Sequence, residues 1–250
     1  MARSKNIFTR VEKKYVITHE QYVNIIDILM KHMRNDEFGE STICSVYFDT
    51  PDSRLVRHSV SKPVYKEKLR LRCYNTPGDD SEAFYELKKK YKGIVYKRRI
   101  DMTYKEAFDI MNGDKSLPDN QIGKEVKYAF KFYKGLAPSF CMFCERIALF
   151  DREDDNLRLT IDRNLRYRTC DFDLRNGSYG LPLLDRDKYV LEVKTAFAMP
   201  LWLSRLLDEN KIYPSSFSKY GTAYGIELRK HLNEGNSFVA VPDAVKNIDF

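Results

Sequence analysis

Basic residues alternate with apolar ones in the segment KEKLRLR, residues 66–72. In an extended chain successive side chains point to opposite faces, so Lys66, Lys68, Arg70 and Arg72 share one face. Lysine and arginine at this spacing suit the binding of phosphate or another anion, because their charged nitrogens donate strong hydrogen bonds to its oxygens. The segment therefore predicts a strand with one wholly cationic face.

The same period of two recurs in seven further segments, and we expect each of them to be a strand. Charged side chains occupy alternate positions, and the positions between them hold mainly Val, Leu, Ile, Tyr and Phe. The eight expected strands cover residues 10–17, 41–50, 66–74, 84–92, 94–102, 140–150, 156–164 and 189–195. Eight strands are enough to close a barrel with a modest interior.

The charges on these strands are strongly skewed toward cations. A single charged strand face usually meets water, and such a face normally mixes both signs to limit repulsion. The cations are Arg10, Lys14, Lys66, Lys68, Arg70, Arg72, Lys88, Lys90, Lys97, Arg99, Arg146, Arg158 and Lys194. The carboxylates are only Glu12, Glu86, Asp162 and Glu192. If these strand faces point inward, their cationic side chains would repel one another in an empty lumen. Such a lumen would favour a bound polyanion.

Helices must cover the apolar strand faces if the charged faces line the interior. Thr18 and Gln21 form a capping box that begins one helix. Further amphipathic helices are expected near residues 104–111, 123–133, 201–208 and 222–232. We therefore expect a single α+β domain over residues 1–250, with a closed eight-stranded antiparallel β-barrel, a polar basic lumen and helices packed outside. Residues 233–250 have little periodicity and are expected to form a peripheral tail.

The composition restricts the partners of the chain. Its 250 residues carry 43 Lys and Arg against 36 Asp and Glu, a net charge of +7 that favours an anionic partner. No segment approaches the roughly 18 apolar residues that span a bilayer, so we expect a cytoplasmic protein without direct membrane insertion. The basic residues alternate with core residues, and no known nucleic-acid-binding motif occurs, so we expect no nucleic-acid partner.

The ordered set of charged segments resembles a known family. The resemblance is carried by RVEKKY, VYFDT, KEKLRLR, FYELKKK, VYKRR, ERIALF, LRLTIDRNLRYR, VLEVKT and SFSKYG, from about Arg10 to about Tyr224. These segments are similar to the polyphosphate polymerase domain of the vacuolar transporter chaperone (VTC) complex, in its stand-alone bacterial form. That domain belongs to the triphosphate tunnel metalloenzyme (CYTH-like) superfamily. The resemblance implies an eight-stranded tunnel, ATP and polyphosphate or triphosphate as ligands, and Mn²⁺ or Mg²⁺ as cofactor.

The resemblance also implies roles for individual residues. By position, phosphate binding is implied for Lys14, Arg70, Arg72, Lys88, Lys97, Arg146, Arg158, Ser218 and Lys219. The strand pattern adds Lys68, Arg99 and Lys194 to the expected phosphate-binding set. The expected catalytic residues are Arg70, Arg72, Lys88, Arg146, Arg158 and Glu192. Glu192 and Glu12 are the expected metal ligands, whereas Arg10 stands where the superfamily signature has its first glutamate.

The implied reaction passes the γ-phosphoryl group of ATP to the end of a growing polyphosphate chain and releases ADP. Such a site needs no side-chain nucleophile, since alignment and charge stabilisation are sufficient. Two alternatives stay open. A tripolyphosphate or nucleoside triphosphate hydrolase on the same fold would use Glu12, Glu86 or Asp162 to position or deprotonate water. A non-catalytic polyphosphate-binding module would keep only the cationic lumen. The sequence identifies no protein partner.

Overall fold

A computed structural model describes residues 11–92, 94–154, 156–196 and 198–233. Within them the strands are β1 (Val11–Thr18), β2 (Met33–Asp49), β3 (Tyr65–Tyr74), β4 (Glu82–Tyr91), β5 (Ile94–Thr103), β6 (Ala137–Asp151), β7 (Arg158–Arg168), β8 (Leu181–Pro182) and β9 (Lys188–Thr195). The helices are α1 (His19–His32), α2 (Arg54–Val60), α3 (Tyr104–Asn112), α4 (Gln121–Phe132), α5 (Leu201–Glu209) and α6 (Lys219–Asn233), with a 3₁₀ turn at Leu174–Asn176. The expected tail beyond Asn233 and the unusual Arg10 lie outside the described residues.

The strands form one antiparallel sheet in the order β1-β9-β7-β6-β2-β3-β4-β5, with β8 paired to β7. In the described chain the two edge strands, β1 and β5, do not pair with each other, so the predicted closed barrel is wrong. The α+β class agrees with the structure. Alternation assigns each side chain to a face, but closure depends on the stagger between strands, which alternation does not define.

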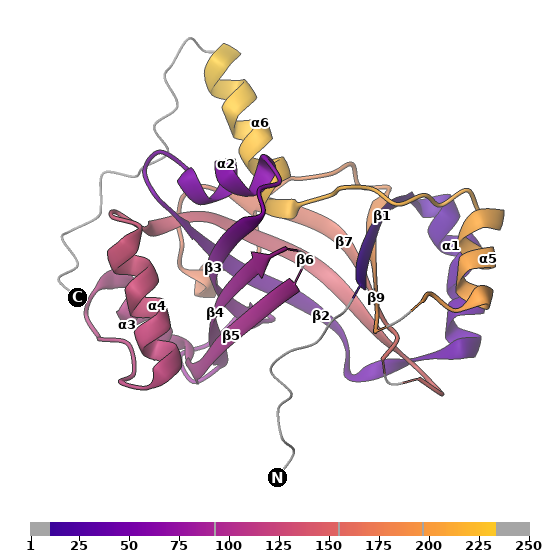
Figure 1. The fold of residues 1–250 in the computed structure, drawn as a ribbon, viewed down its shortest axis with the longest axis horizontal. Coiled ribbons are helices and arrows are strands. Elements are labelled where there is room, and N and C mark those ends of the chain that lie inside the picture. The colour runs from indigo at the N-terminus through magenta and orange to yellow at the C-terminus, as the bar shows by residue number, and fades with distance from the viewer. Residues whose placement is uncertain (1–10, 93, 155, 197, 234–250) are drawn as a thin grey trace.

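The open sheet is nevertheless strongly curled, as the arc from β1 and β9 round to β4 and β5 in Figure 1 shows. The Lys88 ammonium of β4 lies 3.7 Å from the Glu12 carboxylate of β1. These strands are six places apart in the sheet, which would separate them by about 29 Å if the sheet were flat. The two ends of the sheet therefore face each other across a concave surface.

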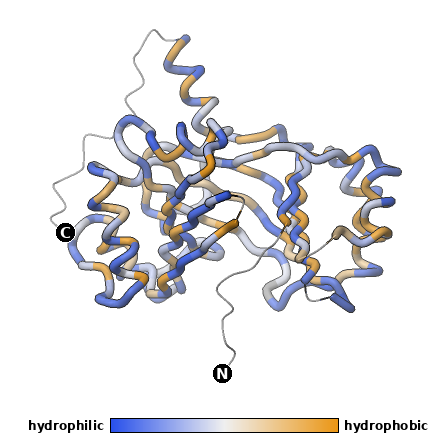
Figure 2. The backbone as a smooth tube through the Cα atoms, in the orientation of Figure 1, coloured by the Kyte–Doolittle hydropathy of each residue, from blue (hydrophilic) through white to orange (hydrophobic). Residues whose placement is uncertain are grey.

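Apolar residues on the convex surface form two cores beneath two pairs of helices. One core contains residues from the five strands β2, β3, β4, β5 and β6 together with α3 and α4, and it includes Leu71, Tyr85 and Val126. The other joins β1, β7 and β9 with α1 and α5, and includes Leu29 and Leu191. Figure 1 shows these helix pairs at opposite ends of the molecule, and Figure 2 shows the alternating hydropathy along the strands between them. The helices thus leave the charged strand faces on the concave side.

Local capping explains where most helices begin. Thr18 and Gln21 form the predicted capping box at α1, and Thr103 and Glu106 form another at α3. The sequence analysis missed α2 because its cap comes from a distant residue. The backbone N–H groups of Leu55 and Val56 donate to the carboxylate of Asp49, at 2.8 and 2.9 Å.

Helix α6 departs from the expectation that every helix packs outside the sheet. Its Tyr220 and Ala223 belong to a third core together with Tyr47 of β2 and Phe140 of β6. Tyr47 lies opposite Arg70 in the register of β2 and β3, so this core occupies the concave side. Consequently α6 covers one part of the concave surface, and the residues at its N-terminus lie beside the charged part.

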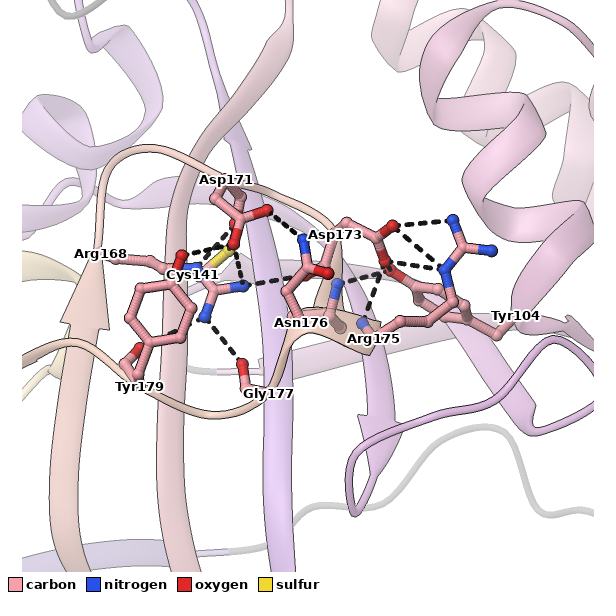
Figure 3. A network of polar contacts seen from close by, with 10 residues as sticks. Tyr104, Cys141, Arg168, Asp171, Asp173, Arg175, Asn176, Gly177 and Tyr179 are labelled. Atoms are coloured by element: carbon pink, nitrogen blue, oxygen red, sulfur yellow. Dashed lines mark hydrogen bonds and ion pairs between the residues drawn. The ribbon is translucent and has the colours of Figure 1, made fainter.

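A polar network outside the concave surface holds the irregular segment between β7 and β8 (Figure 3). The guanidinium of Arg168, a residue only 4% exposed, donates hydrogen bonds of 2.7–3.3 Å to the carbonyls of Asp171, Asp173, Gly177 and Tyr179. It also lies over the Tyr179 ring, 4.2 Å from the centroid. Arg168 therefore has a structural role, because its guanidinium donors are taken up by backbone carbonyls of the same chain.

We expect Arg168→Ala to lower the free energy of unfolding by about 3 kcal/mol, since four carbonyls lose a charged donor that is itself buried. Urea denaturation measures this change. Arg175→Ala is the matched control in the same network, because Arg175 pairs with Asp173 and Asp79 at the surface and should cost less than about 1 kcal/mol. An Arg168→Ala protein as stable as the parent would remove Arg168 from this role.

Candidate functional site

Cationic side chains from eight elements gather on the concave surface. We call this set the cationic face. It contains four carboxylates, Glu12, Glu86, Asp162 and Glu192, and ten cations, Lys14, Lys68, Arg70, Arg72, Lys88, Lys97, Arg146, Arg158, Lys194 and Lys219. Each carboxylate contacts two or three cations. The cationic face therefore keeps a large positive excess after all of its internal ion pairs are made.

Glu86 of β4 is shared by three cations. Arg70 Nη2 lies 2.6 Å and Arg72 Nε 3.9 Å from its Oε2, and Lys97 contacts its Oε1. Burial raises the pKa of Glu86, but Arg70, Arg72 and Lys97 outweigh it, so the pKa lies well below its usual range. Glu86 is thus a fixed anion that orients the guanidinium groups of Arg70 and Arg72 on the neighbouring strand β3.

Asp162 of β7 is fully buried and holds two further cations. Arg146 binds it in a bidentate fashion, with Nε 2.6 Å from Oδ1 and Nη2 2.8 Å from Oδ2. Lys219, the first residue of α6, contacts the same carboxylate. Burial raises the pKa of Asp162, but the two cations lower it far more. This carboxylate ties α6 to the sheet and sets the position of both cations.

Glu192 and Glu12 lie together at the β1 and β9 end of the sheet. Glu192 is 2.6 Å from Lys194 Nζ and 3.6 Å from Lys14 Nζ, and Glu12 is 3.3 Å from Lys14 Nζ. Burial and the neighbouring Glu192 raise the pKa of Glu12, but Lys88, Lys14 and Lys194 lower it more. Both carboxylates are therefore anionic, and their neighbours hold them in place.

Two cations of the face have no carboxylate within 4 Å among the described residues. Lys68 Nζ lies 3.4 Å from Ser218 Oγ, and burial together with nearby lysines lowers the pKa of Lys68 to about 8. The guanidinium of Arg158 lies over the Phe150 ring, and its buried Nε has no hydrogen-bond partner in the described part of the chain. The same holds for the buried hydroxyl of Thr160, next to Arg158 on the same face. The charges of Lys68 and Arg158 are therefore not balanced by a carboxylate of the described residues.

The structure brings nearly all of the predicted site residues together. Ser218 joins them through Lys68, just before α6 begins. Arg99 lies opposite Glu86 in the register of β4 and β5 and so shares the concave face, but its guanidinium pairs with Asp101 at 2.7 Å and lies over the Phe84 ring. The sequence analysis missed Tyr47, which accepts a hydrogen bond from Arg70. Its alternation with Ser45 and Asp49 in β2 was the available signal.

The donor set restricts how a divalent cation would bind. Among the residues that the structure describes, no group of three or more His, Cys, Asp and Glu side chains is placed to hold a metal ion. Glu192 and Glu12 offer hard oxygen donors, and Mg²⁺ commonly uses one or two carboxylates and takes its other ligands from water and substrate phosphates. These two residues therefore fit an ion shared with bound phosphate and do not fit a site that is complete without substrate.

Solved structures share this fold. A candidate adenylate cyclase from Bacillus halodurans superposes with a TM-score of 0.55 at 14% identity, over 85% of this chain and 95% of that one. A candidate adenylyl cyclase from Hippeastrum, described as having a dominant triphosphatase activity, gives a TM-score of 0.49 at 15% identity, over 92% and 98%. At such identities the first similarity shows the fold alone. No curated protein matches the sequence.

The sequence itself matches the model of the VTC domain family over residues 9–227. This match spans every strand of the sheet and the first half of α6, so it contains the whole cationic face. Among the described helices, none combines the length and the apolarity needed to cross a lipid bilayer. The chain belongs to the VTC domain family.

Proposed function

We propose that this protein is a metal-dependent polyphosphate polymerase that transfers the γ-phosphoryl group of ATP to a growing polyphosphate chain and releases ADP. One observation carries the proposal. The cationic face sets ten cations against four carboxylates, and Lys68 and Arg158 keep donors without an anionic partner. A chain of phosphates matches this elongated excess of charge, and membership of the VTC domain family supports the choice.

The arrangement suits alignment of two phosphate groups. Arg70 and Arg146 are each fixed by a buried carboxylate, so their remaining guanidinium donors are oriented before substrate binds. Arg158 of β7 and Lys68 of β3 lie on strands three places apart in the sheet and would bind further phosphates of the donor and the acceptor. In-line transfer then needs only positioning and charge stabilisation, because the acceptor is the terminal oxygen of the chain.

Glu192 and Glu12 would hold a Mn²⁺ or Mg²⁺ ion beside the bound phosphates. The ion would supply Lewis-acid stabilisation of phosphoryl oxygens. Lys14 and Lys194 contact the Glu192 carboxylate and would bind phosphate oxygens beside it. Lys88 and Lys97 would complete the binding surface from the opposite edge of the sheet.

The carboxylates argue against hydrolysis as the main reaction. A general base for water needs a pKa near the working pH. The pKa values of Glu12, Glu86 and Asp162 are all lowered by neighbouring cations, and each carboxylate is engaged by at least two of them. The three residues that were candidates for activating water are therefore weak bases.

The test is incubation of the protein with ATP and Mn²⁺, then with ATP and Mg²⁺, with separate assays for ADP, free phosphate and long-chain polyphosphate. We expect ADP and polyphosphate in matching amounts. ADP with an equal amount of free phosphate and no polymer would show that the protein is a hydrolase and not a polymerase. Binding of tripolyphosphate without any release of ADP would show that it is a non-catalytic binding module.

A further inference from the structure

A single phenol lies among the guanidinium groups of the cationic face. Tyr47 of β2 is opposite Arg70 of β3, and its hydroxyl oxygen accepts a hydrogen bond from Arg70 Nη1 at 3.0 Å. The side chain is largely buried, since the residue is 8% exposed. Its ring stacks on Tyr220 of α6, with centroids 4.8 Å apart. The stacked ring fixes the direction of the hydroxyl toward the cations.

The hydrogen bonding of this phenol is incomplete. Within the described chain its oxygen accepts from Arg70, while its own proton has no acceptor. A buried donor without an acceptor costs free energy, and a ligand that supplies an acceptor recovers it. Arg70 also has a strong partner in Glu86, so it can turn its Nη1 from Tyr47 to a ligand oxygen without losing its position.

Positive charge surrounds the hydroxyl. The titratable and charged groups that face it are Lys68, Arg70 and Arg72 of β3, Lys14 of β1 and Tyr220 of α6. β6 contributes only the uncharged Phe140 at the paired position. Burial raises the pKa of Tyr47, but Arg70, Lys68 and Arg72 outweigh it and lower the pKa to about 7. The phenol therefore gains and loses its proton near neutral pH.

We propose that Tyr47 is a substrate-contacting residue: its hydroxyl donates a hydrogen bond to an oxygen of the bound phosphate chain, and it accepts the Arg70 hydrogen bond when phosphate is absent. This inference rests on the proposed function in one respect, since it requires phosphate at the cationic face. Only the protonated phenol can act in this way, because the phenolate has no proton to donate and repels the anion. Phosphate binding is thereby linked to proton uptake by Tyr47.

The test compares tripolyphosphate affinity at pH 6 and pH 8 in the parent protein and in Tyr47→Phe, which keeps the ring and its stacking. Between these values the parent should lose about tenfold more affinity than Tyr47→Phe, as expected for a group with a pKa near 7 that must be protonated. Tyr85→Phe is the control, because Tyr85 is buried on the convex side and donates to the Ala107 carbonyl. Its pH profile should match that of the parent.

A second measurement follows the phenolate directly. At pH 8 the near-ultraviolet tyrosinate absorbance of the parent should fall when tripolyphosphate is added, and that of Tyr47→Phe should not. Parallel pH profiles of the parent and Tyr47→Phe, with unchanged absorbance, would make Tyr47 a stacking residue only. Failure of the parent to bind tripolyphosphate at either pH would overturn the proposed function itself and this inference with it.

Discussion

The variant Asp162→Asn is expected to lose about 3–5 kcal/mol of unfolding free energy, because it leaves two buried cations without their carboxylate. Asp162 is 0% exposed and binds both Arg146 and Lys219, whose side chains are only 16% and 20% exposed, so water replaces the lost carboxylate only in part. The amide is nearly the same size as the carboxylate, so the loss reports charge and not packing. Urea denaturation of the two proteins measures the difference.

Tripolyphosphate should restore much of this stability, since an anion on the cationic face takes over the charge that Asp162 supplied. Asp52→Asn is the matched control, because Asp52 is largely exposed and pairs with Arg57, and it should cost less than about 1 kcal/mol. Equal unfolding free energies for Asp162→Asn and the parent would show that Arg146 and Lys219 do not depend on this carboxylate.

The variant Glu192→Gln is expected to lower metal-dependent turnover of ATP roughly 100-fold or more, as does removal of one well-placed charge from other active sites. Glu192 is buried beside Lys194 and Lys14, and it is the principal metal ligand in the proposed function. Tripolyphosphate binding without metal should remain measurable, because the substitution frees Lys194 and leaves Lys14 paired with Glu12 alone. Steady-state rates with Mn²⁺ and calorimetry without metal separate the two effects.

Glu145→Gln is the control for this variant. Glu145 lies on the convex side of β6, where it pairs with Arg163 at 2.9 Å, so the substitution removes the same charge far from the cationic face. Its turnover should equal that of the parent. Full activity of Glu192→Gln with Mn²⁺ or Mg²⁺ would end the assignment of this residue as a metal ligand.

The sequence predicted which side chains share a face better than it predicted the sheet. The alternation in residues 66–72 assigned Arg70 and Arg72 correctly because a strand of period two has only two faces. Closure was wrong because it depends on long-range register. β2, for example, begins well before the predicted strand, and its pairing with β6 contains bulges that shift the register.

Interactions between residues far apart in the sequence could not be predicted from local sequence patterns. Helix α2 has its N-terminal donors capped by Asp49, which belongs to the preceding strand, so a search for an adjacent cap fails. Residues 41–50 were predicted as a strand without a role for Tyr47, although its neighbours at alternate positions, Ser45 and Asp49, are polar. Its contact with Arg70 exists only because β2 and β3 pair in this register.

The central claim is that the concave surface binds a chain of phosphates, and calorimetric titration with tripolyphosphate tests it most directly. The double variant Lys68→Ala with Arg158→Ala removes the two cations of the face that have no carboxylate partner in the described part of the chain, and so leaves none of the described carboxylates unpaired. Its control, Arg163→Ala with Lys124→Ala, removes the same net charge from exposed ion pairs elsewhere. We predict affinity about 100-fold weaker than that of the parent in the first variant and close to it in the second. Equal affinities in all three proteins would show that phosphate does not bind at this surface.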